Sequence, residues 1–131
     1  MGRSVPARPL ILDAGALIGI DDRDRRVAVL IRRARELGSP IIVPAGVLAQ
    51  AWRDGARQAN LAKLLHARDV TIVELTAALA KAAGELCGRT GTRDVVDASI
   101  VIVTRQRRGA VATSDSADLR QLDPKLIIVT I

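Results

Sequence analysis

The chain has 131 residues, the length of one domain with its own hydrophobic core, so folding requires neither disulfides nor a structural metal. A single cysteine, Cys87, excludes an internal disulfide, and no apolar run approaches the roughly 20 residues of a membrane span. No charged segment followed by a long apolar stretch opens the sequence. These features predict a cytoplasmic protein with no membrane attachment.

The charge is strongly positive, with a formal net charge of +6 at pH 7 and only three lysines among the 20 basic residues. Arginine favours partners that carry phosphate, because its planar guanidinium group binds two phosphate oxygens at once. Replacement of lysine by arginine in a GC-rich genome would give the same composition, which therefore leaves both explanations open. Trp52 is the one aromatic residue, so a bound nucleic acid would be held by its backbone rather than by base stacking.

Short apolar runs alternate with helical patterns along the whole chain. Strands are expected at residues 10–13, 41–43, 70–73, 110–113 and 126–130. Helices are expected from about Asp22 to Gly38, from Pro44 to Leu65 with a bend near Gly55, over 77–87, 94–107 and 117–122, with a loop over 88–92. Strands separated by helices predict a single domain over residues 1–131, a three-layer α/β/α fold with a central parallel five-stranded sheet.

Four aspartates are expected to meet at one edge of this sheet. Asp13 and Asp115 end predicted strands, while Asp94 and Asp97 open a predicted helix. In right-handed crossovers, helix N-termini lie at the same edge as strand C-termini. If the first and fourth strands are neighbours, Asp13 and Asp115 flank the crevice where such sheets bind ligands.

Clustered carboxylates repel one another, and a pair at about 5 Å costs on the order of 3 kcal/mol at an effective dielectric near 20. Protonation or a divalent cation would relieve this repulsion. Hard oxygen ligands without nearby histidine or cysteine select Mg²⁺ or Mn²⁺ over zinc. The sequence therefore predicts a magnesium or manganese site among these acids.

Each acid also has a purely structural alternative. Asp13 would bond to backbone N–H groups at the strand end, and Asp97 would serve only the start of its helix. Asp94 suits a helix N-cap, and Asp115 suits a turn in the segment Thr-Ser-Asp-Ser. Asp118 suits the first turn of a short helix.

Three segments, 12–18, 97–101 and 113–119, carry a resemblance to a known family. Their sequences Leu-Asp-Ala-Gly-Ala-Leu-Ile, Asp-Ala-Ser-Ile-Val and Thr-Ser-Asp-Ser-Ala-Asp-Leu are similar to the ordered acidic motifs of PIN-domain ribonucleases. The chain length resembles that of VapC toxins of type II toxin–antitoxin modules. This resemblance covers nearly the whole chain and implies a metal-dependent endoribonuclease that leaves a 5′-phosphate and a 3′-hydroxyl.

The resemblance also implies roles for individual residues. The catalytic acids that hold Mg²⁺ or Mn²⁺ would be Asp13, Asp97 and Asp115. Accessory roles would fall to Asp94, Asp118, Gln50 and Ser114. Arginines near the acidic motifs would contact RNA phosphates, and closeness in sequence selects Arg53, Arg93 and Arg120.

Gln50 departs from the family pattern, because PIN domains usually carry a glutamate at the matching place in the helix after the second strand. Glutamine can still ligate through its carbonyl oxygen, but it lacks the charge. A catalytically impaired PIN-like module that binds RNA or protein is therefore an alternative. A haloacid-dehalogenase-like phosphatase is disfavoured, because that family needs an aspartate where this chain has Gly15.

The composition and the resemblance together suggest protein partners besides the RNA substrate. Apolar residues make up 49% of the chain and the mean hydropathy is +0.21, more than a small domain needs inside. A homodimer would bury part of this excess. The resemblance to toxins implies a cognate antitoxin whose segment covers the acidic crevice.

Overall fold

The computed structural model describes residues 7–131 and is built around a parallel sheet with strand order β3-β2-β1-β4-β5. The strands are β1 (Leu10–Leu12), β2 (Ile41–Pro44), β3 (Val70–Val73), β4 (Ala110–Thr113) and β5 (Ile128–Thr130). The first and fourth strands are neighbours, with Leu12 paired to Ala112 at their ends. This confirms the predicted parallel five-stranded sheet.

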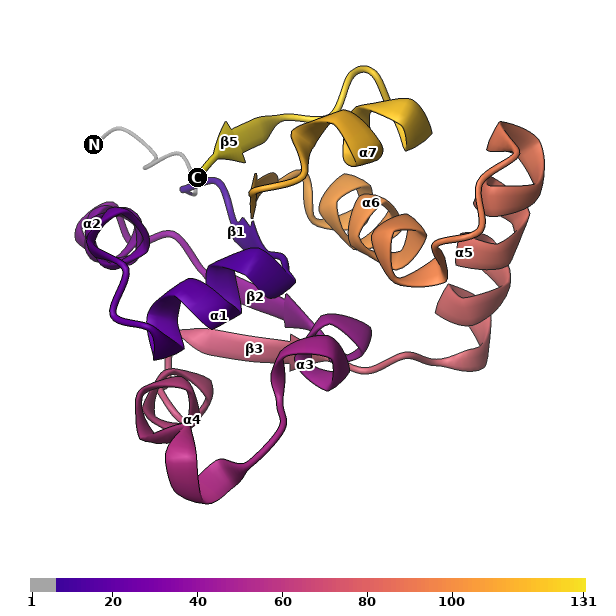
Figure 1. Cartoon of the computed structure of the whole chain (residues 1–131). Helices are drawn as coiled ribbons and strands as arrows, with labels where there is room; N and C mark the ends of the chain where they lie inside the picture. Colours follow the sequence, from indigo (N-terminus) through magenta and orange to yellow (C-terminus); the bar gives the residue numbers. More distant parts are fainter. Residues whose placement is uncertain (1–6) are drawn as a thin grey trace, which may run out of the picture.

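Helices cover both faces of the sheet, as Figure 1 shows. They are α1 (Ala14–Asp21), α2 (Arg25–Glu36), α3 (Ala45–Ala51), the 3₁₀ turn η1 (Gly55–Arg57), α4 (Ala59–Leu65), α5 (Ala77–Thr90), α6 (Val95–Arg107) and α7 (Ser116–Leu122). One face carries α1, α2 and α4, and the other carries α5, α6 and α7. The three-layer α/β/α fold is therefore confirmed. Among residues 7–131, no helix is long and apolar enough to cross a membrane.

Burial explains why the three central strands form where they do. Every residue of β1, β2 and β4 is buried, and Ile11, Ile41 and Val111 have no exposed surface. A continuous apolar run without alternation is typical of a strand that helices cover on both faces. The edge strands β3 and β5 are partly exposed, and Ile72 on β3 is 39% exposed.

Helix α1 begins directly after β1, earlier than the first helix expected from the sequence. The Asp13 carboxylate caps it by accepting a hydrogen bond from the backbone N–H of Ala16 at 2.9 Å. Residues 14–21 do not divide into an apolar and a polar face, so the spacing of apolar residues does not predict this helix. The helix expected from Asp22 begins at Arg25, after the capping residue Asp24.

The helix expected to run from Pro44 to Leu65 with a bend is wrong, because α3 ends at Ala51. The carbonyl oxygen of the Gln58 side chain accepts hydrogen bonds from the N–H groups of Arg53 (2.7 Å) and Asp54 (3.0 Å). Its amide nitrogen donates to the Ala51 carbonyl oxygen at 2.9 Å. The buried Gln58 side chain thus supplies the partners that an uninterrupted helix would have given these groups.

Two other boundaries also differ from the sequence expectations. The loop expected over residues 88–92 is wrong, because α5 continues through Gly88 to Thr90 and ends at Gly91 with a left-handed φ of 70°. Glycine tolerates this conformation without steric cost, as is common at helix ends. The fifth strand is shorter than expected and begins at Ile128.

Candidate active site

Asp13 lies between the end of β1 and the start of α1, where it is 7% exposed. Burial raises the pKa of its carboxyl group above the ordinary value, and the charge of Asp115 adds to this. The hydroxyl of Thr113 and the backbone N–H groups of Ala16 and Ser114 act in the opposite direction without cancelling the shift in pKa. The structural alternative for Asp13 is thus real, but its capping bond engages one oxygen, Oδ1.

Thr113 connects the two acids that end neighbouring strands. It is fully buried at the end of β4, and its hydroxyl oxygen accepts a hydrogen bond from the Asp115 N–H at 2.8 Å. The same hydroxyl group lowers the pKa of the Asp13 carboxyl group. Asp115 precedes α7, and within residues 7–131 its side chain makes no capping hydrogen bond. Its exposed carboxylate is therefore available to a ligand.

Asp94 and Asp97 occupy the start of α6. Asp94 is the N-cap, and its Oδ1 accepts a hydrogen bond from the Asp97 N–H at 3.0 Å, which confirms its expected structural role. Asp97 lies in the first turn and is partly buried. Burial raises the pKa of Asp97 to about 7, with further contributions from the charges of Asp94, Asp118, Asp115 and Asp13.

The fold therefore gathers five carboxylates at the carboxyl edge of the sheet. The other four act on Asp97 electrostatically, although the five come from three separate segments of the chain. Across the described residues, no three acidic, histidine or cysteine side chains already stand close enough to form a metal-ligand group. The donors are all hard oxygens, which fits a divalent cation of the magnesium type and not a zinc site.

Gly15 permits a close approach between the first turn of α1 and the end of β4. A Cβ atom at this position would overlap the Ser114 hydroxyl oxygen and would lie 3.3 Å from Oδ1 of Asp13. Ser114 is exposed at the same edge, and both its hydroxyl oxygen and Oδ1 of Asp13 lie next to Gly15. The sequence shows Gly15 two positions after Asp13, but it does not show that a larger residue there would collide with Ser114.

Gln50 lies exposed in the last turn of α3, on the side of that helix that faces α6. Gly46 lies one turn earlier on the same side of α3. A Cβ atom placed on Gly46 would lie 3.5 Å from the Val96 side chain and 4.0 Å from the Ser99 hydroxyl oxygen, both on α6. Helices α3 and α6 are in direct contact. Gln50 therefore sits beside the helix that carries Asp97.

The three candidate arginines differ in how far they are engaged within the protein. The Nη1 atom of Arg53 donates to the carbonyl oxygens of Ala49 (3.0 Å) and Trp52 (2.8 Å), so its guanidinium group covers the end of α3. Arg93 and Arg120 are exposed. Within residues 7–131 neither of these two makes a side-chain hydrogen bond or an ion pair.

A parallel sheet in the order 3-2-1-4-5, with acids after the neighbouring strands β1 and β4 and at the start of a facing helix, defines a class of α/β/α domains with an acidic carboxyl edge. The family model for the PIN domain matches residues 10–124. The chain belongs to the PIN domain family. No curated protein sequence matched the chain.

Solved structures with the same fold are found despite low sequence identity. VapBC2 from Rickettsia felis, bound to a DNA fragment from its promoter, matches with a TM-score of 0.70 and 16% identity over 93% of this chain and 98% of that chain. FitAcB from Neisseria gonorrhoeae matches with a TM-score of 0.63 and 16% identity over 91% and 95% of the two chains. PAE2754 from Pyrobaculum aerophilum matches with a TM-score of 0.60 and 17% identity over 92% of this chain and 83% of that chain.

Proposed function

We propose that this protein is an endoribonuclease that hydrolyses RNA phosphodiester bonds with Mg²⁺ or Mn²⁺, held by Asp13, Asp97 and Asp115. One observation carries the proposal: Asp13 and Asp115 follow adjacent strands, and the Thr113 hydroxyl group accepts a hydrogen bond from the Asp115 N–H and lowers the pKa of Asp13. The acidic start of α6 adds Asp97 at the same edge. Membership of the PIN family supports nuclease activity at such an edge.

The carboxylates have separate tasks in this scheme. When bound, a divalent cation supplies Lewis acidity for the attacking water and for the scissile phosphate. Asp13 is held in place by the Ala16 N–H, which binds its Oδ1. Asp115 contributes an uncapped carboxylate, and Asp97 contributes the partly buried one on which the surrounding negative charges act. Asp94 positions Asp97 by capping α6, and Asp118 adds charge at the rim.

RNA is the substrate we favour, because the chain is rich in arginine, which binds phosphate, and because the motifs resemble those of ribonucleases. Arg93 and Arg120 extend from segments next to the acids and are exposed, so they can hold phosphates that flank the scissile bond. Arg53 would have to leave the carbonyl oxygens at the end of α3 to do the same. The near absence of aromatic side chains leaves the RNA backbone as the main contact.

We also propose that the protein is the toxin of a cytoplasmic type II toxin–antitoxin module, with residues 1–131 forming one PIN-like domain. The similarity of the fold to VapBC2 and FitAcB and the resemblance of the motifs to VapC toxins support this proposal. A cognate antitoxin would cover the acidic crevice and prevent cleavage. Exposed apolar side chains, among them Trp52, Leu75 and Val95, support a homodimer that would bury them.

RNA cleavage tests the proposal directly. The purified chain is incubated with a pool of single-stranded and structured RNA in Mg²⁺, in Mn²⁺ and in EDTA, beside Asp97→Asn and Asp69→Asn variants. Asp69 forms a surface ion pair with Arg35, away from the acidic edge, so its variant controls for the loss of a carboxylate. We expect metal-dependent cleavage in the wild type and in Asp69→Asn and none in Asp97→Asn. Equal cleavage by all three would contradict the assignment.

A second candidate is a PIN-like module that binds RNA or protein without cutting it. Two observations favour it: Gln50 brings no charge to the acidic edge, and the described residues hold no ready-made group of three metal ligands. This candidate requires RNA or protein binding that survives in EDTA, with no cleavage in either metal. The RNA cleavage experiment therefore distinguishes the nuclease from the non-catalytic binding module.

A further inference from the structure

A second charged pocket lies at the amino edge of the sheet, at the opposite end of the strands from the acids. It encloses about 270 Å³, and three chain segments line it: the residue before Pro9 and β1, the end of α6 and the approach to β5. We name it the amino-edge pocket; its charged residues are Arg8, Arg105, Arg108, Asp123 and Lys125. Four cations thus face one carboxylate, an excess that the acidic site does not explain.

Both oxygens of the one carboxylate in the pocket accept hydrogen bonds, one from the Arg105 side chain and one from the Lys125 backbone. Asp123 Oδ2 accepts a hydrogen bond from Arg105 Nε at 2.8 Å, and Oδ1 accepts one from the Lys125 N–H at 2.9 Å. Burial alone would raise the pKa of Asp123, but the hydrogen bonds and charges of Arg105 and Lys125 lower it below the ordinary value. Asp123 therefore stays ionised and fixes the position of Arg105.

Arg105 is bound through Nε alone, which leaves its two terminal nitrogens for a ligand. Within residues 7–131 neither of them makes a hydrogen bond, and the side chain is 44% exposed. A guanidinium group held in this way has little conformational entropy left to lose when it binds an oxyanion. It resembles a preformed donor more than a freely moving surface side chain.

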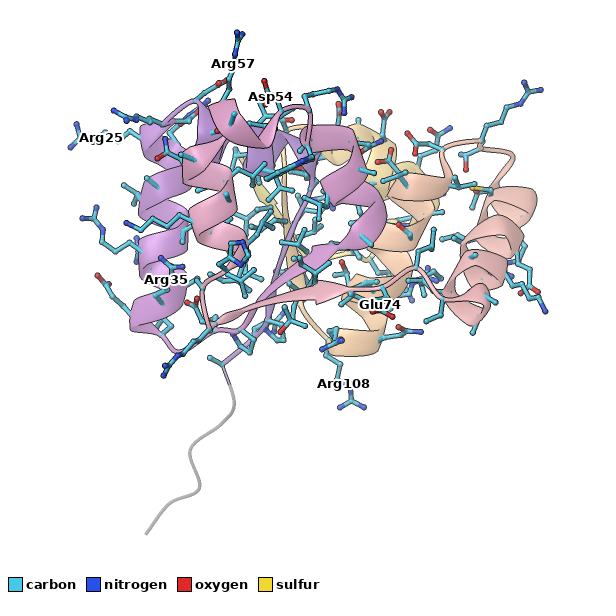
Figure 2. All side chains as sticks on the ribbon, turned by 90° about the horizontal axis from the view of Figure 1, so that it is seen from below. Arg25, Arg35, Asp54, Arg57, Glu74 and Arg108 are labelled. Carbon is cyan, nitrogen blue, oxygen red and sulfur yellow. The ribbon has the colours of Figure 1, made fainter. Side chains whose placement is uncertain are left out.

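Arg108 stands in the left-handed region after α6, with φ 52°. Arg23 after α1 does the same with φ 57°, while Gly38 after α2 and Gly91 after α5 each have φ 70°. Glycine would adopt this conformation without the cost that a Cβ atom imposes. Figure 2 shows the Arg108 side chain extending from the domain at the end opposite to Asp54 and Arg57.

The negative end of the α6 dipole accounts for cations on that helix, because basic residues in a last turn are stabilising. It does not account for Arg8 and Lys125, which come from other segments and complete the same pocket. The volume of about 270 Å³ is close to the lower limit of roughly 300 Å³ for small-molecule sites, so the pocket suits a small anionic group.

We infer that the amino-edge pocket binds a phosphate group, supplied either by the backbone of a bound RNA or by a free phosphate. Arg105, Arg108, Arg8 and Lys125 are the donors, and Asp123 is a positioning residue that acts through Arg105. The RNA source rests on the proposed function, whereas binding of free phosphate does not. An RNA held here would reach from the acidic edge to the opposite end of the strands.

The matched variants are Arg108→Gly and Lys125→Gln in the pocket and Arg107→Gln outside it. Arg107 lies at the same end of α6 and is exposed, so its variant removes the same charge from the same helix terminus without touching the pocket. Arg108→Gly relaxes a left-handed residue, so we expect its melting temperature to equal or exceed that of the wild type. Loss of binding in this variant would therefore not reflect misfolding.

Two titrations test the inference. In the first, amide chemical shifts are followed as inorganic phosphate replaces chloride at constant ionic strength. In the second, RNA binding to the Asp97→Asn protein is measured in EDTA over a range of salt concentrations, which makes the result independent of cleavage. Each pocket variant is expected to weaken binding roughly fivefold and to lower the salt slope for RNA by about 1, while Arg107→Gln changes binding less.

Each outcome decides a different point. Phosphate shifts confined to residues 104–109 and 123–127, without an effect on RNA binding, assign the pocket to a free phosphate. Weaker RNA binding in the pocket variants alone assigns it to the RNA backbone. If Arg107→Gln and the pocket variants bind phosphate and RNA equally, the inference is overturned, while the proposed nuclease activity remains to be judged by cleavage.

Discussion

Asp94 caps helix α6 by accepting a hydrogen bond from the backbone N–H of Asp97 at 3.0 Å. The two acids are therefore joined, but they do different things: Asp94 fixes the start of the helix, and Asp97 lies partly buried among the charges of the other acids. Asp94 also contributes to the raised pKa of Asp97. This division of roles means that substitutions at the two positions have different consequences.

Asp97→Asn is expected to stabilise the metal-free protein at alkaline pH while it abolishes cleavage. The pKa of Asp97 is about 7 in the folded protein against 3.8 without the fold, so between these values the folded state binds more protons than the unfolded state. Stability contributed by the protonated group is therefore lost as pH rises through this window. The neutral amide avoids the loss.

Thermal unfolding in EDTA at pH 4 and pH 8 checks this expectation. The melting temperature of Asp97→Asn should exceed that of the wild type by several degrees at pH 8 and by little at pH 4. Asp69→Asn, which removes a surface ion pair, should show no such gain at pH 8. A gain of the same size at both pH values would contradict the account of Asp97.

Gly15→Ala is expected to lower cleavage at least tenfold with little loss of stability. The added Cβ would overlap the Ser114 hydroxyl oxygen and press on the Asp13 carboxylate, whereas alanine is a better helix former than glycine by about 1 kcal/mol. Gly84→Ala in the interior of α5 is the control, because a Cβ there meets nothing within 4 Å. Steady-state cleavage and melting temperature are measured for both; full activity in Gly15→Ala would show that the close approach is dispensable.

Most of the fold could be predicted because burial leaves a direct mark on the sequence. The runs at Leu10–Leu12, Ile41–Pro44 and Ala110–Thr113 are apolar except for Thr113, and the structure buries each of them between helices. The break between α3 and α4 could not be predicted, because it depends on tertiary hydrogen bonds of the Gln58 side chain. A single glutamine in a helical pattern gives no sign of this role.

The site was predictable as a set of acids and not as an arrangement. Topology alone places Asp13 and Asp115 at neighbouring strand ends, and the capping role of Asp94 follows from its position before a helix. The role of Thr113 between two acids depends on the direction of one hydroxyl group, which no spacing in the sequence specifies. The close approach at Gly15 likewise depends on how α1 packs against the end of β4.

Gln50→Glu is expected to tighten binding of Mn²⁺ about tenfold, because a carboxylate adds negative charge beside the helix that carries Asp97. Gln50 is exposed, so the substitution should leave the melting temperature of the metal-free protein nearly unchanged. Gln50→Ala, which adds no charge, should bind Mn²⁺ about as the wild type does. Calorimetric titration compares the three proteins, and equal affinities of Gln50→Glu and Gln50→Ala would exclude Gln50 from the site.

Asp123→Asn is expected to destabilise the protein by about 1–2 kcal/mol at pH 7, after allowance for the exposure of Arg105. Because the folded-state pKa of Asp123 is lowered, its contribution is present above pH 3.8 and is lost as pH falls through the folded value. Urea unfolding at pH 7 and pH 3 should therefore show a smaller difference from the wild type at pH 3. A constant difference would mean that packing, not charge, sets the effect.

Binding of Mn²⁺ to the purified protein at pH 8, followed by calorimetry, tests most directly whether the acidic edge is a metal site. The wild type and the Asp69→Asn control should bind Mn²⁺, and Asp13→Asn, Asp97→Asn and Asp115→Asn should each weaken that binding at least tenfold while remaining folded. Such a result would establish that three separated segments of the chain hold one cation. Unchanged binding in all three variants, or none in the wild type, would contradict a metal-dependent nuclease and favour the non-catalytic module.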